Sequence, residues 1–163
     1  MFNIEQDELE EINKHRYIEL ESFVLMPNHF HLMVFESKAG GTAQYMQRVL
    51  NAYTKYFNAK YQKVGHLFQG PFKAVHIENN RQLLHLSAYI HKNPGEIIGW
   101  KNKEHIFPWS SYRDYVDANR WGKLLKTNII HSQFSNRKEY KRFVQTSSAK
   151  ESKENLDKEL LID

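Results

Sequence analysis

Alternation of apolar and charged residues predicts an antiparallel sheet near the start of the chain. Ile18 and Leu20 alternate with two glutamates over 17–25, which is the pattern of a strand with one covered face. A second strand is expected over 29–35, after a break at Pro27 and Asn28, and a third over 72–78.

Helical spacing of apolar residues predicts two main helices, over 42–61 and 80–91. Asn79 or Asn80 suits the N-cap of the second helix, and Pro94 disfavours helical backbone at the preceding residue, so this helix should end near 93. Shorter helices are expected over 6–14 and 137–143. The apolar positions expected to face the core are Met46, Val49, Leu50, Tyr53 and Phe57 in the first main helix, and Leu83, Leu86 and Ile90 in the second.

Two histidines, His29 and His31, flank one apolar residue at the start of the second predicted strand. Side chains at positions i and i+2 of a strand point to the same face, so the two imidazoles would project together at a spacing that suits a small divalent metal. The alternative is that both are packed or hydrogen-bonded without a ligand, which is the usual role of a single histidine in a strand.

A second pair of polar residues lies at the end of the helix expected over 80–91. Tyr89 and Asn93 are four residues apart, so a phenol and an amide would project from one face of its last turn. Taken separately, the tyrosine would be an aromatic residue at the edge of the core, and Asn93 would cap the helix.

Four motifs, in this order, resemble the single-tyrosine HUH transposases, and more closely their REP-associated tyrosine transposase branch. They are MPNHFH at 26–31, KYQKVGHLFQGPFKA at 60–74, YIHKNP at 89–94 and PWSSYRDY at 108–115, and the resemblance covers about 16–144. It implies an α+β fold: a ferredoxin-like antiparallel sheet with helices on one face, plus a C-terminal helical tail.

The resemblance also implies the chemistry of the site. His29, His31 and Asn93 would bind Mg²⁺ or Mn²⁺, and Tyr89 would be the nucleophile. Members of the family cut single-stranded DNA, leaving a 5′-phosphotyrosine and a free 3′-hydroxyl that later rejoins DNA. The residue types suit these roles, because a phenol with a pKa of about 10 is a weak nucleophile that needs a polarised phosphate. Two imidazoles and an amide leave the charge of the metal intact, and imidazole suits Mn²⁺ better than Mg²⁺.

The charge pattern fits a nucleic-acid partner. The 163-residue chain has a formal net charge of +4 and a sequence pI of about 9.1, a modest basic excess. Basic and aromatic residues interleave over 42–73, which favours contacts with phosphates and stacking on unpaired bases. Pro71 replaces an arginine that is usual in the family, so one backbone contact is expected to be missing. The expected DNA-binding residues are Lys73, Lys55, Lys63, Arg48 and Lys60.

Composition excludes several classes of protein and of functional site. The absence of cysteine excludes disulfides, thiol catalysis and cysteine-based zinc sites, and no apolar run approaches the roughly 20 residues of a membrane span. We expect a cytoplasmic protein that binds single-stranded or hairpin DNA, either as a monomer or as a homodimer. His91 faces away from Tyr89 and is expected to be a surface or capping residue, with a role near the DNA left open.

The expected organisation is one domain over 1–146, with a catalytic core over 16–95 and an extension over 96–146, followed by a charged, disordered tail over 147–163. The family sheet has a central first strand, and residues 1–14 show no strand pattern. We therefore expect that the sheet is incomplete, that a partner chain supplies the missing strand, or that the chain is an N-terminally truncated copy. The sheet would then have unpaired edges. Two further functions remain: an inactive remnant that binds DNA hairpins, and a metal-dependent phosphoesterase that uses water.

Overall fold

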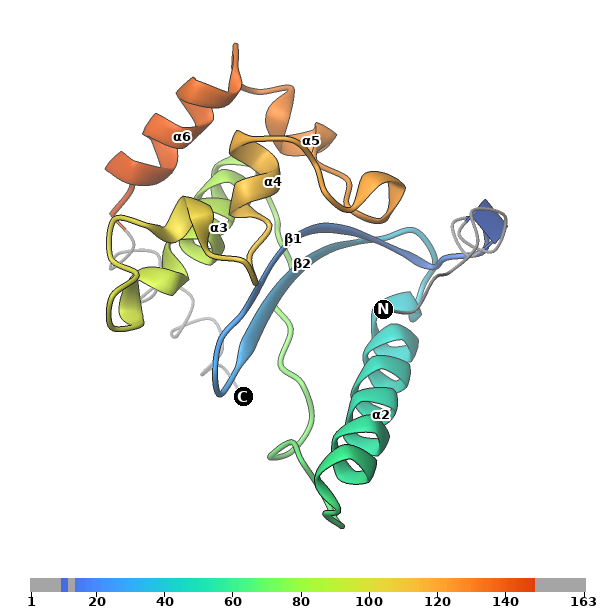
Figure 1. Cartoon of the computed structure of the whole chain (residues 1–163). Coiled ribbons are helices and arrows are strands. Elements are labelled where there is room, and N and C mark those ends of the chain that lie inside the picture. Colours follow the sequence, from blue (N-terminus) through green and yellow to red (C-terminus); the bar gives the residue numbers. More distant parts are fainter. Residues whose placement is uncertain (1–9, 12–13, 149–163) are drawn as a thin grey trace. The chain divides into compact units, whose positions relative to one another are not determined.

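The computed structural model describes residues 10–11 and 14–148, which form an α+β arrangement, as expected. Strands β1 (Ile18–Leu25) and β2 (Phe30–Glu36) pair in a two-stranded sheet (Figure 1). The predicted helix over 6–14 and the predicted tail over 147–163 lie mostly outside the described residues. The helices are α2 (Gly41–Tyr61), α3 (Asn80–Lys92), α4 (Tyr112–Val116), α5 (Asn128–His131) and α6 (Arg137–Thr146), with short 3₁₀ helices η1 (Asn93–Glu96), η2 (Glu104–Ile106) and η3 (Gly122–Leu124).

The described residues divide into two compact units. The first comprises the described residues up to Ile18 together with Glu36–Ala74, and it contains α2. The second comprises Glu19–Phe35 and the described residues from Val75 onward, and it contains most of the sheet and helices α3 to α6.

In the first unit, a glutamate at the end of β2 organises the start of α2. The Glu36 carboxylate accepts hydrogen bonds from the backbone N–H groups of Gly40 at 3.0 Å and Thr42 at 2.9 Å. Hydrogen bonds from Thr42 are the main reason that the pKa of Glu36 is lowered. Gly41 lies so close to Tyr17 that a Cβ atom there would stand 2.7 Å from the Tyr17 carbonyl oxygen. Only glycine therefore fits at the first position of this helix without a shift.

The predicted core face of α2 is only partly correct. Met46 is buried, and Leu50 and Phe57 are half-buried. Val49 and Tyr53 are 37% and 50% exposed, so the prediction that they face the core is wrong. Helical spacing marks the apolar side of a helix, but how much of that side is covered depends on what packs against it.

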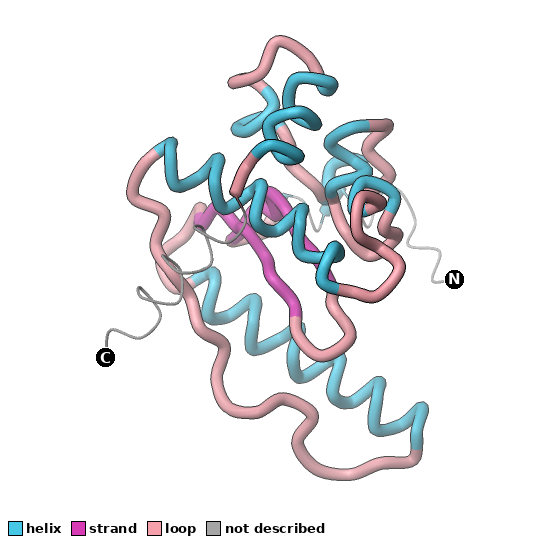
Figure 2. The backbone as a smooth tube through the Cα atoms, turned by 90° about the vertical axis from the view of Figure 1, so that its left-hand side faces the viewer, coloured by secondary structure: helices cyan, strands magenta, loops and turns pink. Residues whose placement is uncertain are grey.

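The strand predicted over 72–78 does not form. Residues 62–79, which connect α2 to α3, contain neither helix nor strand (Figure 2). Residues 72, 75 and 77 are half-buried and 73, 74, 76 and 78 are exposed, so burial alternates strictly only over 74–78. A strand also needs a hydrogen-bonded neighbour, and in the described part of the chain the sheet contains β1 and β2 alone.

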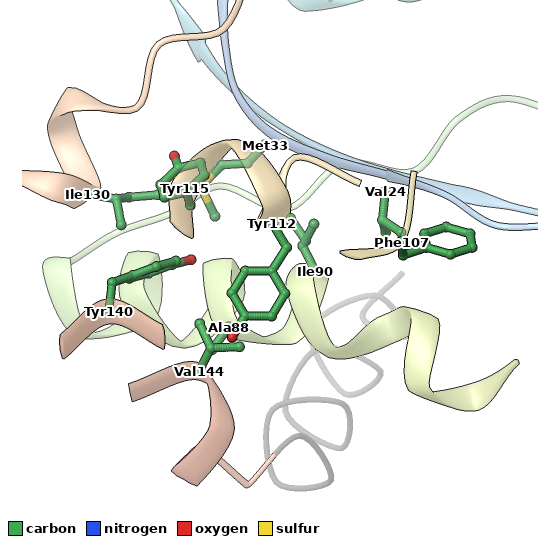
Figure 3. Close-up of a cluster of buried hydrophobic side chains, with 10 residues drawn as sticks. All are labelled: Val24, Met33, Ala88, Ile90, Phe107, Tyr112, Tyr115, Ile130, Tyr140 and Val144. Atoms are coloured by element: carbon green, nitrogen blue, oxygen red, sulfur yellow. The ribbon is translucent and has the colours of Figure 1, made fainter. Parts of the chain in front are cut away.

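The core of the second unit lies between the sheet and its helices. Val24 of β1 and Met33 of β2 join Ala88 and Ile90 of α3 in one cluster of buried side chains (Figure 3). Helices α3, α4 and α6 pack against one another around it. The cluster is completed by Phe107, Tyr112, Tyr115, Ile130, Tyr140 and Val144.

The C-terminal extension covers one edge of β1. The Leu25 N–H donates to the Trp109 carbonyl at 2.8 Å, and the Lys126 N–H donates to the Leu20 carbonyl at 2.8 Å. The Tyr115 hydroxyl also donates to the Glu21 carbonyl at 2.7 Å. The expectation that both sheet edges are unpaired is therefore wrong for β1, because residues from the extension occupy its free edge.

Candidate active site

A tight turn between β1 and β2 brings the two motif histidines to the end of the sheet. The Met26 N–H donates to the His29 carbonyl at 2.8 Å, closing a loop that contains only Pro27 and Asn28. His29 follows this loop directly and His31 is the second residue of β2. Their ring centroids are 5.1 Å apart, with the ring planes at 79°. The expected side-by-side placement is therefore present.

Hydrogen bonding fixes which nitrogen of His29 carries the proton. His29 Nδ1 lies 2.8 Å from Asn28 Oδ1, and because a carbonyl oxygen only accepts, Nδ1 must donate. In the neutral ring, Nε2 then has a free lone pair. It lies 3.4 Å from Asn93 Oδ1, which also carries lone pairs. In this tautomer both facing atoms carry lone pairs, as two ligands of one cation do, whereas a protonated Nε2 would donate to Asn93 Oδ1.

Helix α3 supplies the other two predicted site residues. It begins at Asn80 with Asn79 as N-cap, whose side chain accepts from the Gln82 N–H at 2.9 Å. The helix ends at Lys92, as expected from the position of Pro94. Asn93 nevertheless keeps a helical backbone, with φ −51° and ψ −41°. Its N–H donates to the Tyr89 carbonyl, so Asn93 lies one turn beyond Tyr89. The side chain of Asn93 is buried.

Tyr89 lies against the histidine pair. Its ring centroid is 5.2 Å from that of His31, with the planes at 73°. The side chain is half-buried, and His31 Nε2 is itself buried. Within the described residues, the Tyr89 hydroxyl has no hydrogen-bond partner, which leaves it available to a substrate. The fold thus brings Tyr89, His29, His31 and Asn93 together from two elements.

The donor set fits a divalent cation. His29 Nε2 and Asn93 Oδ1 present lone pairs to a common point, and the ring of His31 adjoins that of His29. Imidazole and amide ligands suit Mn²⁺, and an amide oxygen suits Mg²⁺. Within the described residues, no three His, Cys, Asp or Glu side chains cluster in a way that could hold a metal ion, so the set here consists of two histidines and an amide.

The expectation for His91 is wrong. It is completely buried and neither lies at the surface nor caps the helix. Its ring stacks on Tyr112 at 5.0 Å between centroids, and its two nitrogens contact Tyr140 Oη at 2.6 Å and Ser111 Oγ at 2.9 Å. Burial lowers its pKa to about 3, and the nearby His131 contributes. No direct signal for the burial of His91 is present in the sequence, because its partners lie 20 and 49 residues away.

The predicted DNA-binding residues are all exposed, and all belong to the first unit, whereas the site above belongs to the second. Lys60 Nζ donates to Tyr56 Oη at 3.2 Å and lies 5.5 Å from the centroids of both Tyr56 and Tyr61. These tyrosines are about half exposed, as is Tyr53. Arg48, Lys55, Lys63 and Lys73 complete the set.

Helix α6 carries further basic residues beyond those predicted to bind DNA. Arg137, Lys138 and Arg142 are exposed, and Lys141 is half-buried. The one acidic residue in this helix, Glu139, accepts from the Ser135 N–H at 2.6 Å. The signal was present in the sequence as four basic residues within 137–142.

The candidate site thus combines a hairpin that carries two histidines with a helix that carries a tyrosine and is followed by an asparagine. The family model of IS200-like transposases matches residues 5–93, more than half of the chain. The chain therefore belongs to the IS200-like transposase family, a class of DNA-binding and DNA-cleaving enzymes. Neither the curated proteins nor the solved structures contain a match. Among the described residues, no helix has both the length and the apolar character needed to span a membrane.

Proposed function

We propose that this protein cuts one strand of single-stranded DNA and transfers the cut end, with Tyr89 as nucleophile. The observation that carries the proposal is the meeting of α3 with the β1–β2 hairpin. Tyr89 lies 5.2 Å from His31 between ring centroids, and Asn93 Oδ1 lies 3.4 Å from His29 Nε2. A nucleophile beside a set of metal-ligand atoms is what phosphoryl transfer requires.

The reaction is a double displacement at phosphorus. The Tyr89 oxygen forms a bond to the scissile phosphorus, and the bond from phosphorus to the 3′-oxygen breaks. The phenol proton passes to water, and the departing 3′-oxygen takes a proton from water. The product is a 5′-phosphotyrosine with a free 3′-hydroxyl. In the reverse displacement a 3′-hydroxyl attacks this linkage and regenerates Tyr89, so no external energy source is required.

His29, His31 and Asn93 would hold the divalent ion, Mg²⁺ or Mn²⁺. When bound there, the ion supplies positive charge to the phosphate in the transition state and orients the leaving oxygen. The chain itself positions the two imidazoles, the amide and the phenol. The backbone N–H of Asn93 donates to the Tyr89 carbonyl, which places this buried residue one helical turn beyond Tyr89.

The substrate in this proposal is single-stranded or hairpin DNA. The exposed residues Arg48, Lys55, Lys60, Lys63 and Lys73 would contact phosphates, and the exposed tyrosines of α2 would stack on unpaired bases. A homodimer is compatible with this proposal, as is a monomer.

A denaturing gel tests the proposal. The full chain is incubated with Mn²⁺ and labelled hairpin DNA taken from beside its own gene, and a covalent adduct that survives denaturation is expected. Tyr89→Phe should abolish the adduct while leaving DNA binding intact, and Tyr17→Phe, which changes a half-buried tyrosine just before β1, should preserve the adduct. Binding without any adduct would indicate an inactive hairpin-binding protein. Cleavage by the Tyr89→Phe variant would indicate a phosphoesterase that uses water.

A further inference from the structure

The end of α3 that carries Tyr89 and Asn93 is attached to the sheet through its opposite side. His91 lies midway between these two residues in the sequence, so on a helix it points away from both. It is completely buried, and its two ring nitrogens contact residues of the C-terminal extension. The extension lies outside the segment matched by the family model, which ends at residue 93.

Ser111 connects this histidine directly to strand β1. Its hydroxyl accepts from the Phe23 N–H at 2.8 Å and donates to the Phe23 carbonyl at 3.1 Å. The Ser111 N–H also donates to that carbonyl, at 3.0 Å. Because the hydroxyl proton is used on Phe23, the contact of 2.9 Å with His91 requires Nε2–H to donate to Ser111 Oγ.

The remaining nitrogen of His91 is fixed by α6. With Nε2 protonated, Nδ1 of the neutral ring accepts from the Tyr140 hydroxyl at 2.6 Å, and that hydroxyl shares its proton with Ser87 Oγ at 3.3 Å. Every polar atom of the ring has one partner, and each partner lies on a different segment of the extension.

We infer that His91 and Ser111 are positioning residues for the tyrosine nucleophile. Ser111 holds β1, β1 pairs with the strand that carries His31, and His91 holds the helix that carries Tyr89. The hydrogen bond between His91 and Ser111 therefore connects the two halves of the candidate site, which are the histidine hairpin and the end of α3. The inference rests on the proposed role of Tyr89 for its catalytic consequence, but the geometry it describes does not depend on DNA or metal.

A matched pair of serine variants separates positioning from simple stability. Ser87 of α3 is also completely buried and lies 3.3 Å from the Tyr140 hydroxyl, but its own hydroxyl donates to Leu84 within the helix and not to the sheet. Ser87→Ala and Ser111→Ala are therefore the same chemical change at two buried sites. We expect both to lower the denaturation midpoint, and only Ser111→Ala to shift Tyr89 relative to the histidines.

The first measurement is NMR of the protein with ¹⁵N- and ¹³C-labelled histidine, without DNA or metal. The ring of Tyr89 lies edge-on to His31, so its ring current should set the chemical shifts of that imidazole. We expect the His31 signals to move in Ser111→Ala and to stay in place in Ser87→Ala. Equal shifts in both variants, or none in either, would overturn the inference.

The second measurement is the rate of adduct formation on the hairpin DNA described above. Ser111→Ala should lower kcat by on the order of 10- to 100-fold with KM unchanged, since small displacements of reacting groups have effects of this size. Ser87→Ala should keep the wild-type kcat, and an equal loss there would contradict the inference. If the wild-type protein forms no adduct while the NMR shifts behave as expected, the proposed function fails and the positioning of Tyr89 stands.

Conservative variants of His91 give an independent result, and they decide the question if Ser111→Ala does not fold. Gln places an amide N–H near the position of Nε2, and Asn places one near Nδ1. His91→Gln should therefore keep the bond to Ser111 and most of the activity, whereas His91→Asn should lose both. The reverse order of activity would show that the contact with Tyr140, and not that with Ser111, positions the helix.

Discussion

His29 and Asn93 lie 64 residues apart in the chain, yet His29 Nε2 and Asn93 Oδ1 are separated by 3.4 Å. The Asn28 side chain holds the proton of His29 on Nδ1, so the two facing atoms are both lone-pair donors. Two such atoms repel each other unless a cation or a proton lies between them. This is the point at which we propose that the metal ion binds.

The first prediction concerns the binding of Mn²⁺. His29→Ala, His31→Ala and Asn93→Ala should each weaken Mn²⁺ binding at least 10-fold, because each removes one of three proposed ligands. The measurement is titration of the protein with Mn²⁺ followed by electron paramagnetic resonance, with no DNA present. His66→Ala, at an exposed position of the first unit, is the control and should bind like the wild type. Unchanged affinity in all three variants would remove the metal site.

The second prediction is a loss of stability in mild acid. Burial lowers the pKa of His91 from 6.5 to about 3, so below pH 6.5 the unfolded chain binds a proton that the folded protein excludes. The free energy of unfolding should fall by up to about 1.4 kcal/mol per pH unit in this range, or about 2 kcal/mol between pH 7 and pH 5. The pKa of His131 is also lowered, mainly by burial, which acts in the same direction.

Urea unfolding at pH 7 and pH 5 measures this effect. His91→Gln removes the titrating group, so the variant should lose less stability than the wild type over the same interval. Equal losses in the two proteins would show that His91 does not titrate as its burial implies.

The third prediction concerns the start of α2. Gly41→Ala would place a Cβ atom 2.7 Å from the Tyr17 carbonyl oxygen, so the backbone must move. The expected cost is about 1–3 kcal/mol in the free energy of unfolding, as for other overpacked sites. Thermal unfolding of the variant beside Ala43→Ser, an exposed position in the same turn, is the measurement. A Gly41→Ala protein as stable as the control would contradict the close approach.

The fourth prediction concerns the binding of DNA. The logarithm of the affinity for single-stranded DNA should fall linearly with the logarithm of the salt concentration, by about 0.7 for each phosphate contacted. Lys55→Ala, Lys63→Ala and Lys73→Ala should each reduce this slope by about one contact. Fluorescence anisotropy at several salt concentrations gives the slope. Slopes that match the wild type in all three variants would exclude these lysines as phosphate contacts.

The local features of this chain were predictable from the sequence because they depend on near neighbours. Strands β1 and β2, the helices α2, α3 and α6, the Asn79 cap and the end of α3 before Pro94 all agree with the predictions within a few residues. The prediction that His29 and His31 share one face follows from the two-residue repeat of a strand. The prediction that Tyr89 and Asn93 share one face follows from the turn of a helix. Each of these depends only on residues close together in the chain.

Tertiary structure decided everything that depends on distant partners. Burial alternates over 74–78 as in a strand, but no strand forms over 72–78 because none of the described residues pairs with it. The sequence marked His91 as a surface or capping residue, yet Ser111 and Tyr140 enclose it in the core. The meeting of the histidine hairpin with α3 likewise requires the packing of the second unit. Sequence patterns determined which residues share a face, whereas burial and long-range hydrogen bonds determined which faces meet.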